Sequence, residues 1–261
     1  MAVRMCVLAS GSSGNCTLVS AGETSILIDA GLSCREIERR LGLAGFTLGQ
    51  IQAVCLSHEH SDHTAGIGVL QRRHGLPLYA NGGTIEALGR DPKLQSLEWR
   101  TFQTGSAFTV GGLHIEPFSV PHDAFEPVGF VIRHGDVRVG IVTDMGMATH
   151  LIRERLRICR AIVIEANHDE GLLRAARRPW QLKQRILGRQ GHLSNDGAAQ
   201  LLAEIAGPAL QQVFLAHLSA DCNRQDLALN FARQRLDAAG QAHVRVSLSH
   251  PDRISEVWIS D

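Results

Sequence analysis

Apolar and polar residues along the chain form two kinds of block, which predict strands and helices in succession. Short apolar runs bounded by Gly, Ser, Asp or His, such as 3–9 and 51–56, are typical of buried strands. A different pattern follows Ser33, where Ile37 and Leu41 recur at helical spacing behind a residue type that caps helices. The two patterns together predict an α/β protein.

Strand-like segments dominate the chain up to residue 144, and helices alternate with strands after it. The segment 141–146 (IVTDMG) echoes the segment 26–31 (ILIDAG), which indicates two similar β-rich halves. We expect strands at 3–9, 16–19, 25–28, 51–56, 76–80, 100–103, 107–110, 114–119, 129–133, 137–143, 161–165, 213–216, 244–248 and 256–259. Helices are expected after Ser33, up to about 74, at 84–88 and 147–158, within 170–190, after Ser194 and at 224–239.

No Pro/Gly/Ser-rich linker and no low-complexity segment interrupts residues 1–261, so the sequence predicts a single domain. A chain of this length can bury a sizeable core. Two β-rich halves, each covered by helices, fit a four-layer helix–sheet–sheet–helix sandwich.

Composition excludes few functions but limits the setting. Hydrophobic residues make up 44% and charged residues 20%, and the formal net charge is zero, so global charge predicts no partner. No apolar run reaches membrane-spanning length, and the first eight residues are too short and too soon interrupted for a secretory signal. Six scattered cysteines without a Cys-x-x-Cys pair favour free thiols in a reducing compartment. We therefore expect a cytoplasmic protein without a membrane partner; the sequence does not set its oligomeric state.

The most informative stretch is 57–64 (SHEHSDHT), which directly follows an expected buried strand. His58 and His60 are two residues apart, so in extended backbone their imidazoles project to the same side. Asp62 and His63 come after the chain bends into a helix and can face a second point nearby. Imidazole with carboxylate suits zinc, manganese or iron better than calcium or magnesium. A solvated histidine loop is the alternative, but four ligand-type residues at this spacing favour a metal site.

Other chemistry-bearing residues also follow expected strands. His122, Asp144 and His217 each stand at a strand end, as does Asp29. Asp29 is either a turn residue or an anchor that holds a ligand-bearing loop from outside. Residues 11–15 (GSSGN) join two strands and either make a tight hairpin turn or expose backbone N–H groups to a phosphate.

The series 58-x-60-x-62-63, followed by His122, Asp144 and His217, resembles the ligands of the metallo-β-lactamase superfamily. The resemblance spans nearly the whole chain. The stretches 11–15 (GSSGN), 121–124 (PHDA), 165–169 (EANHD), 191–195 (GHLSN) and 216–219 (AHLS) are similar to the YycJ-like (WalJ or VicX) branch. That branch is regarded as 5′-to-3′ DNA exonuclease-like and is related to the tRNase Z and RNase J phosphodiesterases.

The resemblance implies a four-layer αβ/βα fold and two divalent metal ions. His58, His60 and His122 would hold one ion; Asp62, His63 and His217 would hold the other; Asp144 would bridge them. Glu165 and His192 match a pair that serves proton transfer in tRNase Z. The chain has neither an insertion large enough for the β-CASP domain of RNase J nor the long arm of tRNase Z, which weighs against RNA degradation and tRNA trimming.

Two cations about 3.5–4 Å apart can share a water molecule and lower its pKa toward neutrality, so that the hydroxide attacks phosphorus. Asp62 is a candidate acceptor for the proton of that water. We expect His192, oriented by Glu165, to protonate the leaving oxygen, because a His beside a carboxylate can stay charged near pH 7. A helix-capping role for His192 is the alternative.

Segment 170–192 suggests the substrate, because it carries six basic residues against one acid in a protein with no net charge. It also contains Trp180, and a basic, aromatic-bearing flap suits single-stranded nucleic acid, most simply single-stranded DNA. A solvated helix face is the alternative reading of such a charge run. A glyoxalase II-like thioesterase or lactonase, and a non-catalytic regulatory module, remain as rival functions. Candidate phosphate contacts are Ser12, Ser13, Asn15, Arg177 and Arg178.

Overall fold

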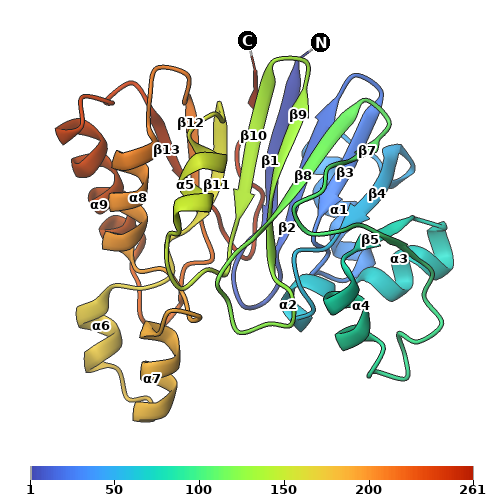
Figure 1. Ribbon diagram of the computed structural model, residues 1–261, viewed down its shortest axis with the longest axis horizontal. Coiled ribbons are helices and arrows are strands. Elements are labelled where there is room, and N and C mark those ends of the chain that lie inside the picture. The colour runs from blue at the N-terminus through green and yellow to red at the C-terminus, as the bar shows by residue number, and fades with distance from the viewer. Residues whose placement is uncertain (1, 261) are drawn as a thin grey trace.

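The computed structural model describes residues 2–260 and contains two seven-stranded sheets packed face to face between layers of helices (Figure 1). The first sheet has the order β14-β1-β2-β3-β4-β5-β6. Its strands are β1 (Val3–Ala9), β2 (Cys16–Ala21), β3 (Thr24–Ile28), β4 (Ile51–Cys55), β5 (Leu78–Ala80), β6 (Trp99–Thr101) and β14 (Trp258–Ile259). The predicted four-layer sandwich is confirmed.

The second sheet has the order β13-β12-β11-β10-β9-β8-β7. Its strands are β7 (Phe108–Val110), β8 (Leu113–Ser119), β9 (Val128–His134), β10 (Val137–Val142), β11 (Ala161–Glu165), β12 (Gln212–Ala216) and β13 (Arg245–Leu248).

Both sheets are built on one plan. In the first sheet, β1, β2 and β3 pair antiparallel, and β4, β5 and β6 then follow parallel to β3. In the second, β8, β9 and β10 pair antiparallel, and β11, β12 and β13 follow parallel to β10. The echo between segments 26–31 and 141–146 therefore marks corresponding strands, because β3 and β10 are both the fourth of seven. The parallel strands of each sheet, together with β8, end at a common edge.

Helices cover the outer face of each sheet because both faces of the strands are apolar. Met5 and Val7 of β1 and Ile26 and Ile28 of β3 pack between the sheets, whereas Cys6, Leu8 and Leu27 pack against helices. Strands buried on both faces appear in sequence as continuous apolar runs. The helices over the first sheet are α1 (Cys34–Leu43), α3 (Ile67–His74) and α4 (Gly82–Leu88); those over the second are α5 (His150–Leu156), α8 (Asn195–Ile205) and α9 (Gln225–Ala238).

Three short helices lie at the edge where the ligand-bearing loops emerge, at the lower side of Figure 1. They are α2 (Ser61–Thr64), α6 (Glu170–Ala175) and α7 (Trp180–Leu187). Helices α6 and α7 project from the sandwich around their own small apolar cluster, which contains Leu173, Ile186 and Cys222. Neither chain end lies near this edge, because both emerge at the opposite side of the molecule (Figure 1).

Several element boundaries differ from the sequence prediction, and two of the differences have a clear local cause. The helix predicted at 147–158 begins at His150, because the Thr149 hydroxyl accepts a hydrogen bond from Ile152 N and caps it. The helical segments predicted within 170–190 are two short helices, which end at Ala175 and resume after Pro179, since a residue ahead of proline avoids the helical conformation. No helix within residues 2–260 combines the length and apolar character needed to cross a bilayer.

Candidate metal centre

The candidate ligands converge at the edge where β4, β8, β10 and β12 end. They fall into overlapping groups of three or four side chains whose donor atoms lie within 4.8 Å of one another. The groups include His58 with His60 and His122; Asp62 with His63 and His217; and His58 with His63 and Asp144. Each residue that the sequence singled out as a ligand is therefore in a cluster.

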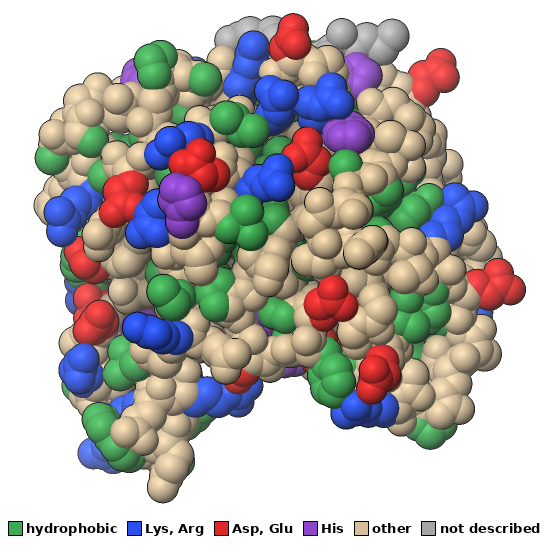
Figure 2. Space-filling view, in the orientation of Figure 1, with side chains coloured by type: hydrophobic (Ala, Val, Ile, Leu, Met, Phe, Trp, Pro, Cys, Tyr) green, Lys and Arg blue, Asp and Glu red, His purple; other side chains and the backbone are tan. Residues whose placement is uncertain are grey.

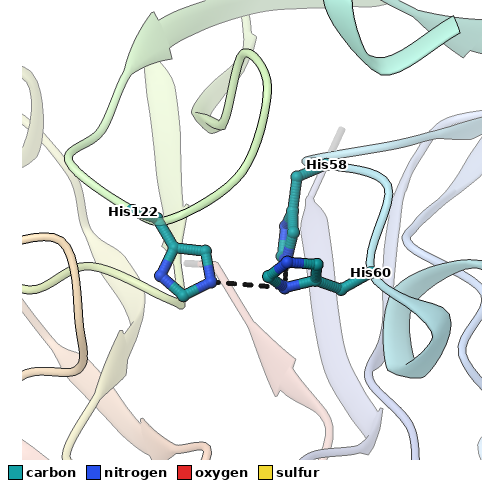
Figure 3. Close-up of side chains that lie close together, drawn as sticks. All are labelled: His58, His60 and His122. Carbon is teal, nitrogen blue, oxygen red and sulfur yellow. Dashed lines mark hydrogen bonds between the residues drawn. The ribbon is translucent and has the colours of Figure 1, made fainter. Parts of the chain in front are cut away.

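Three imidazoles make the first group, and they come from two separate loops (Figure 3). His58 and His60 lie on the loop after β4, and His122 lies on the loop after β8. His58 Nε2 is 3.1 Å and His122 Nε2 is 3.4 Å from His60 Nδ1. Three ring nitrogens thus face one point from different directions.

The second group is carried by helix α2 and the end of β12. His217 Nε2 lies 3.4 Å from Asp62 Oδ2, and His63 Nε2 lies 3.6 Å from the same oxygen. Asp144 lies between the two groups, with Oδ2 at 3.1 Å from His63 Nε2 and Oδ1 at 3.8 Å from His122 Nε2. This is the position from which one carboxylate can reach both groups.

Three strand-end residues here have left-handed backbone, with φ of 60° at Asp29, 55° at Asp144 and 55° at His217. Among residues 2–260 they are the only non-glycine residues with positive φ. Such backbone is unfavourable for most side chains and persists where the surrounding structure enforces it, commonly at functional sites. Here it turns each side chain from the strand direction toward the loops.

Asp29 supports the ligand loop rather than joining a cluster. Its carboxylate accepts hydrogen bonds from Ser57 N and Ser57 Oγ, both at 2.8 Å, and lies 2.8 Å from His63 Nδ1. These contacts direct Nε2 of His63 toward Asp62 and Asp144. The anchoring role for Asp29 is therefore confirmed over a simple turn.

Most of the ligand side chains are held from behind by a second polar partner. His122 Nδ1 lies 3.1 Å from the Gly191 carbonyl, and His217 Nδ1 lies 3.1 Å from Glu165 Oε1. Asn15 Nδ2 donates to Asp62 Oδ2 at 3.1 Å. Partners of this kind fix the tautomer and direction of a metal ligand, so the donor atoms are oriented before any ion arrives.

Helix α2 can lie against the β1–β2 hairpin only because position 31 is a glycine. Asn15 N donates to the Asp62 carbonyl at 2.7 Å, and a Cβ on Gly31 would come within 1.6 Å of that same oxygen. Residues 11–15 thus form the hairpin turn. Asn15, a candidate phosphate contact, is buried against Asp62, whereas Ser12 and Ser13 are exposed.

Burial and charge hold His58 and Asp144 in the forms that bind cations. Burial and the neighbouring His63 lower the pKa of His58 well below its usual value, which keeps that imidazole neutral. Burial alone would raise the pKa of Asp144, but His217 and His63 outweigh it and hold the pKa well below the usual range. Neutral imidazoles and ionised carboxylates are the forms that ligate metals. At His63 and His217 neighbouring carboxylates outweigh burial and raise the pKa, so these two imidazoles release a proton when a cation binds.

The residues fit a divalent metal on their own geometry. Asp144 Oδ2 is buried, makes no regular hydrogen bond among the described residues, and has His63 Nε2 as a charged neighbour at 3.1 Å. Three imidazole nitrogens of the first group converge on one point, where each can offer a lone pair to a cation. Buried polar atoms are costly when unpaired, and a cation is the partner that this donor set suits.

Glu165 and His192 form the predicted pair, and with Asp144 and His217 they make a further group of donor atoms within 4.8 Å of one another. Glu165 is fully buried at the end of β11, and its Oε1 lies 2.7 Å from His192 Nδ1. Its Oε2 accepts from Met145 N and Leu193 N, which fixes the carboxylate from both sides. His192 does not cap helix α8, because Ser194 does. The histidine is thus oriented with Nε2 away from Glu165.

The structure brings the basic segment to the site but pairs much of its charge. A cavity of about 360 Å³ is lined by Ser12, Arg178, Arg185 and His192, among others. Arg178 pairs with Asp221 at 2.6 Å, and Arg185 pairs with Asp123. Arg177 is exposed on the link between α6 and α7. A larger cavity of about 570 Å³ lies at the other end of β4, where it includes Gln52, and contains none of the candidate ligands.

Sequence reasoning missed Ser57, Asp123 and Asn167 as parts of the site. Ser57 Oγ lies 2.9 Å from His58 Nδ1, and Asn167 Nδ2 lies 3.3 Å from His217 Nδ1. Ser57 and Asn167 each come shortly after the end of a strand and next to a histidine. This position is the one signal in the sequence that could have singled them out. The nearby His168 joins no cluster and is buried, with both ring nitrogens lacking a hydrogen-bond partner among the described residues.

Comparisons with known proteins agree with this geometry. A profile described as the beta-lactamase superfamily domain matches residues 24–218. The chain is 36% identical over 244 residues to an exodeoxyribonuclease YycJ of Bacillus anthracis, covering 92% of this chain and 91% of that one. It is also 36% identical to an exodeoxyribonuclease WalJ of Streptococcus pneumoniae, with 85% and 84% covered. The fold matches the metallo-beta-lactamase fold protein YhfI of Bacillus subtilis, with a TM-score of 0.75 at 19% identity and full coverage of both chains.

Proposed function

The chain belongs to the metallo-β-lactamase superfamily, in its YycJ/WalJ-like branch, and we propose that it is a 5′-to-3′ exonuclease of single-stranded DNA. It is a metal-dependent hydrolase. The observation that carries the proposal is the cavity in which His192 lies beside Arg178 and Ser12, next to the clustered ligands. Relatives of nearly the same length that are named exodeoxyribonucleases support the choice of substrate.

We assign two divalent ions, zinc, manganese or iron, to the two groups of side chains. His58, His60 and His122 would hold one ion, and Asp62, His63 and His217 the other, with Asp144 shared between them. When bound, the pair supplies a water of lowered pKa and offsets charge on the phosphate. Because the donors are already fixed by partners behind them, little reorganisation is needed on binding.

The chain's own residues handle the protons. Asp62 Oδ2, fixed by Asn15, accepts a proton from the attacking water. His192 donates a proton from Nε2 to the leaving 3′ oxygen of the terminal nucleotide, whose alkoxide is too basic to depart unprotonated. Glu165 holds His192 by its Nδ1, so that Nε2 points toward the substrate side.

The terminal nucleotide occupies the cavity of about 360 Å³ beside His192. Ser12 and Ser13 on the β1–β2 turn, with Arg177 and Arg178 on the α6–α7 link, contact its 5′ phosphate. Arg178 reaches the phosphate by exchanging its ion pair with Asp221 for one with the substrate. Breaking that ion pair costs free energy, a cost that binding by Arg177 does not carry.

The experiment that tests the proposal measures nucleotide release from 5′-phosphorylated single-stranded DNA with manganese. We expect mononucleotides released from the 5′ end, and inhibition by chelator and by salt. His192→Ala is expected to lower kcat by about 10²- to 10⁴-fold, the range for general acid–base groups, with metal content intact. Loss of metal in that variant would instead identify His192 as a ligand.

A thioester and a lactone serve as comparison substrates, since the rival enzyme class would use the same ions on a carbonyl. Fast thioester hydrolysis without nucleotide release would contradict the nuclease proposal and favour a glyoxalase II-like function. A 3′-labelled strand identifies the end of attack, because release of the label at the earliest times would reverse the proposed direction.

A further inference from the structure

Phe125 is an exposed aromatic side chain at the rim of the metal centre. It stands three residues after His122, and its side chain is 51% exposed. Phe125 N donates to Glu59 Oε1 at 2.9 Å, and Glu59 lies between the ligands His58 and His60. The backbone of Phe125, which follows His122 on one loop, is therefore tied to the other loop of the first group through Glu59.

The backbone that carries Phe125 is fixed by its neighbour Glu126. The Glu126 carbonyl accepts from Asn81 Nδ2 at 2.7 Å, and its carboxylate accepts from Gly83 N at 2.9 Å and Thr104 Oγ1 at 2.6 Å. An exposed side chain on an anchored loop loses little conformational freedom when a ligand covers it. Phe125 is thus presented to solvent by well-paired neighbours.

Arg90, just beyond helix α4, adds a positive charge to this ring. Its guanidinium carbon lies 4.3 Å from the Phe125 ring centroid, within the range of a cation–π contact. Arg90 also pairs with Glu86 one helical turn earlier, at 3.2 Å. An aromatic face and a cation held together match the two parts of a nucleotide, a planar base and a phosphate.

The position of this pair fits the path of a DNA strand. Among residues 2–260, only Phe125 and Trp180 are aromatic within the set of exposed large hydrophobic side chains. Trp180 lies on α7, and Phe125 contacts Arg90 just beyond α4. These two helices belong to the projections on either side of the hollow that Figure 2 shows at the lower side of the molecule. The ligand loops open into the region between these projections (Figure 1).

We propose that Phe125 and Arg90 form a stacking subsite for the nucleotide on the 3′ side of the scissile phosphate. The proposal rests on the proposed exonuclease function, which assigns the terminal nucleotide to the cavity with Ser12 and Arg178. The rest of the strand then leaves past the first group of histidines, where the Phe125 loop lies. A single ring with a cation over it suits a base and phosphate rather than the broad apolar patch that a protein partner needs.

The test compares Phe125→Ala with wild type on 5′-phosphorylated single-stranded oligonucleotides. Phe125→Ala is expected to raise KM by about 5- to 100-fold, the range for removal of one stacking partner, and to lower kcat less. Phe125→Trp should restore KM, whereas Phe125→Leu, apolar but without a π face, should not. Leu43→Ala, at a residue exposed to a similar degree at the end of α1, is the matched control and should leave KM unchanged.

A second arm removes the base instead of the ring. An abasic residue at the second nucleotide should raise KM for wild type and add nothing to the effect of Phe125→Ala, since both changes delete one contact. Arg90→Gln should raise KM and reduce its salt dependence.

The outcomes separate this inference from the proposed function. DNA digestion by wild type with an unchanged KM in Phe125→Ala overturns the subsite alone. Loss of metal in Phe125→Ala also overturns it, because the ring would then only hold Glu59 and its loop. Absence of DNA digestion and binding by wild type overturns the proposed function, and the subsite with it.

Discussion

The two halves of the molecule follow one strand plan but supply the centre in different ways. In the first half, four candidate ligands lie within residues 58–63, on the loop after β4. In the second half, His122, Asp144 and His217 come singly from the ends of β8, β10 and β12. A repeated scaffold can therefore build one site from one dense loop and from three dispersed positions, because its strand ends meet at a common edge.

The contrast is clearest at two aspartates. Asp29 follows β3 and Asp144 follows β10, corresponding strands of the two sheets, and both have left-handed backbone. Asp29 uses its oxygens on Ser57 and on Nδ1 of His63, whereas Asp144 directs Oδ2 at the candidate ligands, 3.1 Å from Nε2 of His63. The same local conformation serves for support in one half and for the proposed metal contact in the other.

The largest effect is expected from Asp144→Asn, which removes the charge that both ions would share. We expect activity to fall by well over about 100-fold, beyond the range for residues that only orient a ligand. Elemental analysis of the purified variant should show fewer than two metal ions per chain. Full metal content in this variant would remove Asp144 from the ligand set and erase its contrast with Asp29.

Asp29→Asn should have a smaller effect, because an amide can still accept from Ser57 N but no longer offers a second oxygen to His63. We expect a loss of about 10- to 100-fold in metal affinity or activity. Titration of the apoprotein with manganese measures it. Equal losses in Asp29→Asn and Asp144→Asn would contradict a division between support and ligand.

The two halves also differ in what their sequence revealed. The metal site could be predicted from loop 57–64 because residues of metal-ligand type lie close together there and follow an apolar strand. The second half offered single residues at strand ends, and only the resemblance to a known ligand series joined them. Hydrogen bonds such as that from Asn15 to Asp62 join loops far apart in the chain, so no local sequence pattern predicts them.

Charge was the least predictable property. The sequence counts six basic residues in 170–192, but it does not show that Arg178 and Arg185 find Asp221 and Asp123 in distant loops. The strands, by contrast, were predicted well because burial on both faces leaves an unbroken apolar run, as in β3 and β11.

Helices α6 and α7 of the second half, with the link between them, lie within the basic segment 170–192, which makes them the place to test substrate contact. Arg177→Gln should reduce the slope of log KM against log salt concentration by about 0.7, the value for one phosphate of a single strand. Arg35→Gln is the matched control, since Arg35 is exposed on α1 of the first half. An equal change in both variants would point to overall charge instead of a phosphate contact.

The smallest effect concerns acid stability. Hydrogen bonds from Arg39 and Arg40 lower the pKa of Glu36 in α1 from 4.5 to about 2. Since the folded pKa is the lower one, this contribution to stability is present above about pH 4.5 and is lost as pH falls toward 2. Glu36→Gln should therefore lower the free energy of unfolding at neutral pH and flatten its decline in acid, as measured by urea unfolding.

Glu204 in α8 provides the comparison from the second half. It pairs with Arg153, whose side chain is partly exposed, whereas Arg40 beside Glu36 is buried. Glu204→Gln should cost about 1 kcal/mol or less, as for exposed ion pairs. Glu36→Gln should cost more, because it leaves a buried guanidinium without its carboxylate. The opposite order would mean that Arg40 depends chiefly on its bonds to the carbonyls of Leu8 and Pro251.

The hydrogen bond between the His122 ring and the Gly191 carbonyl joins a ligand to the residue next to His192. Thermodynamic reciprocity applies to any such link: if the ordered 188–192 turn strengthens ion binding at His122 by some factor, the ion favours that ordered turn by the same factor. Metal binding and the ordering of the turn that carries His192 are then coupled, so that each favours the other by the same factor.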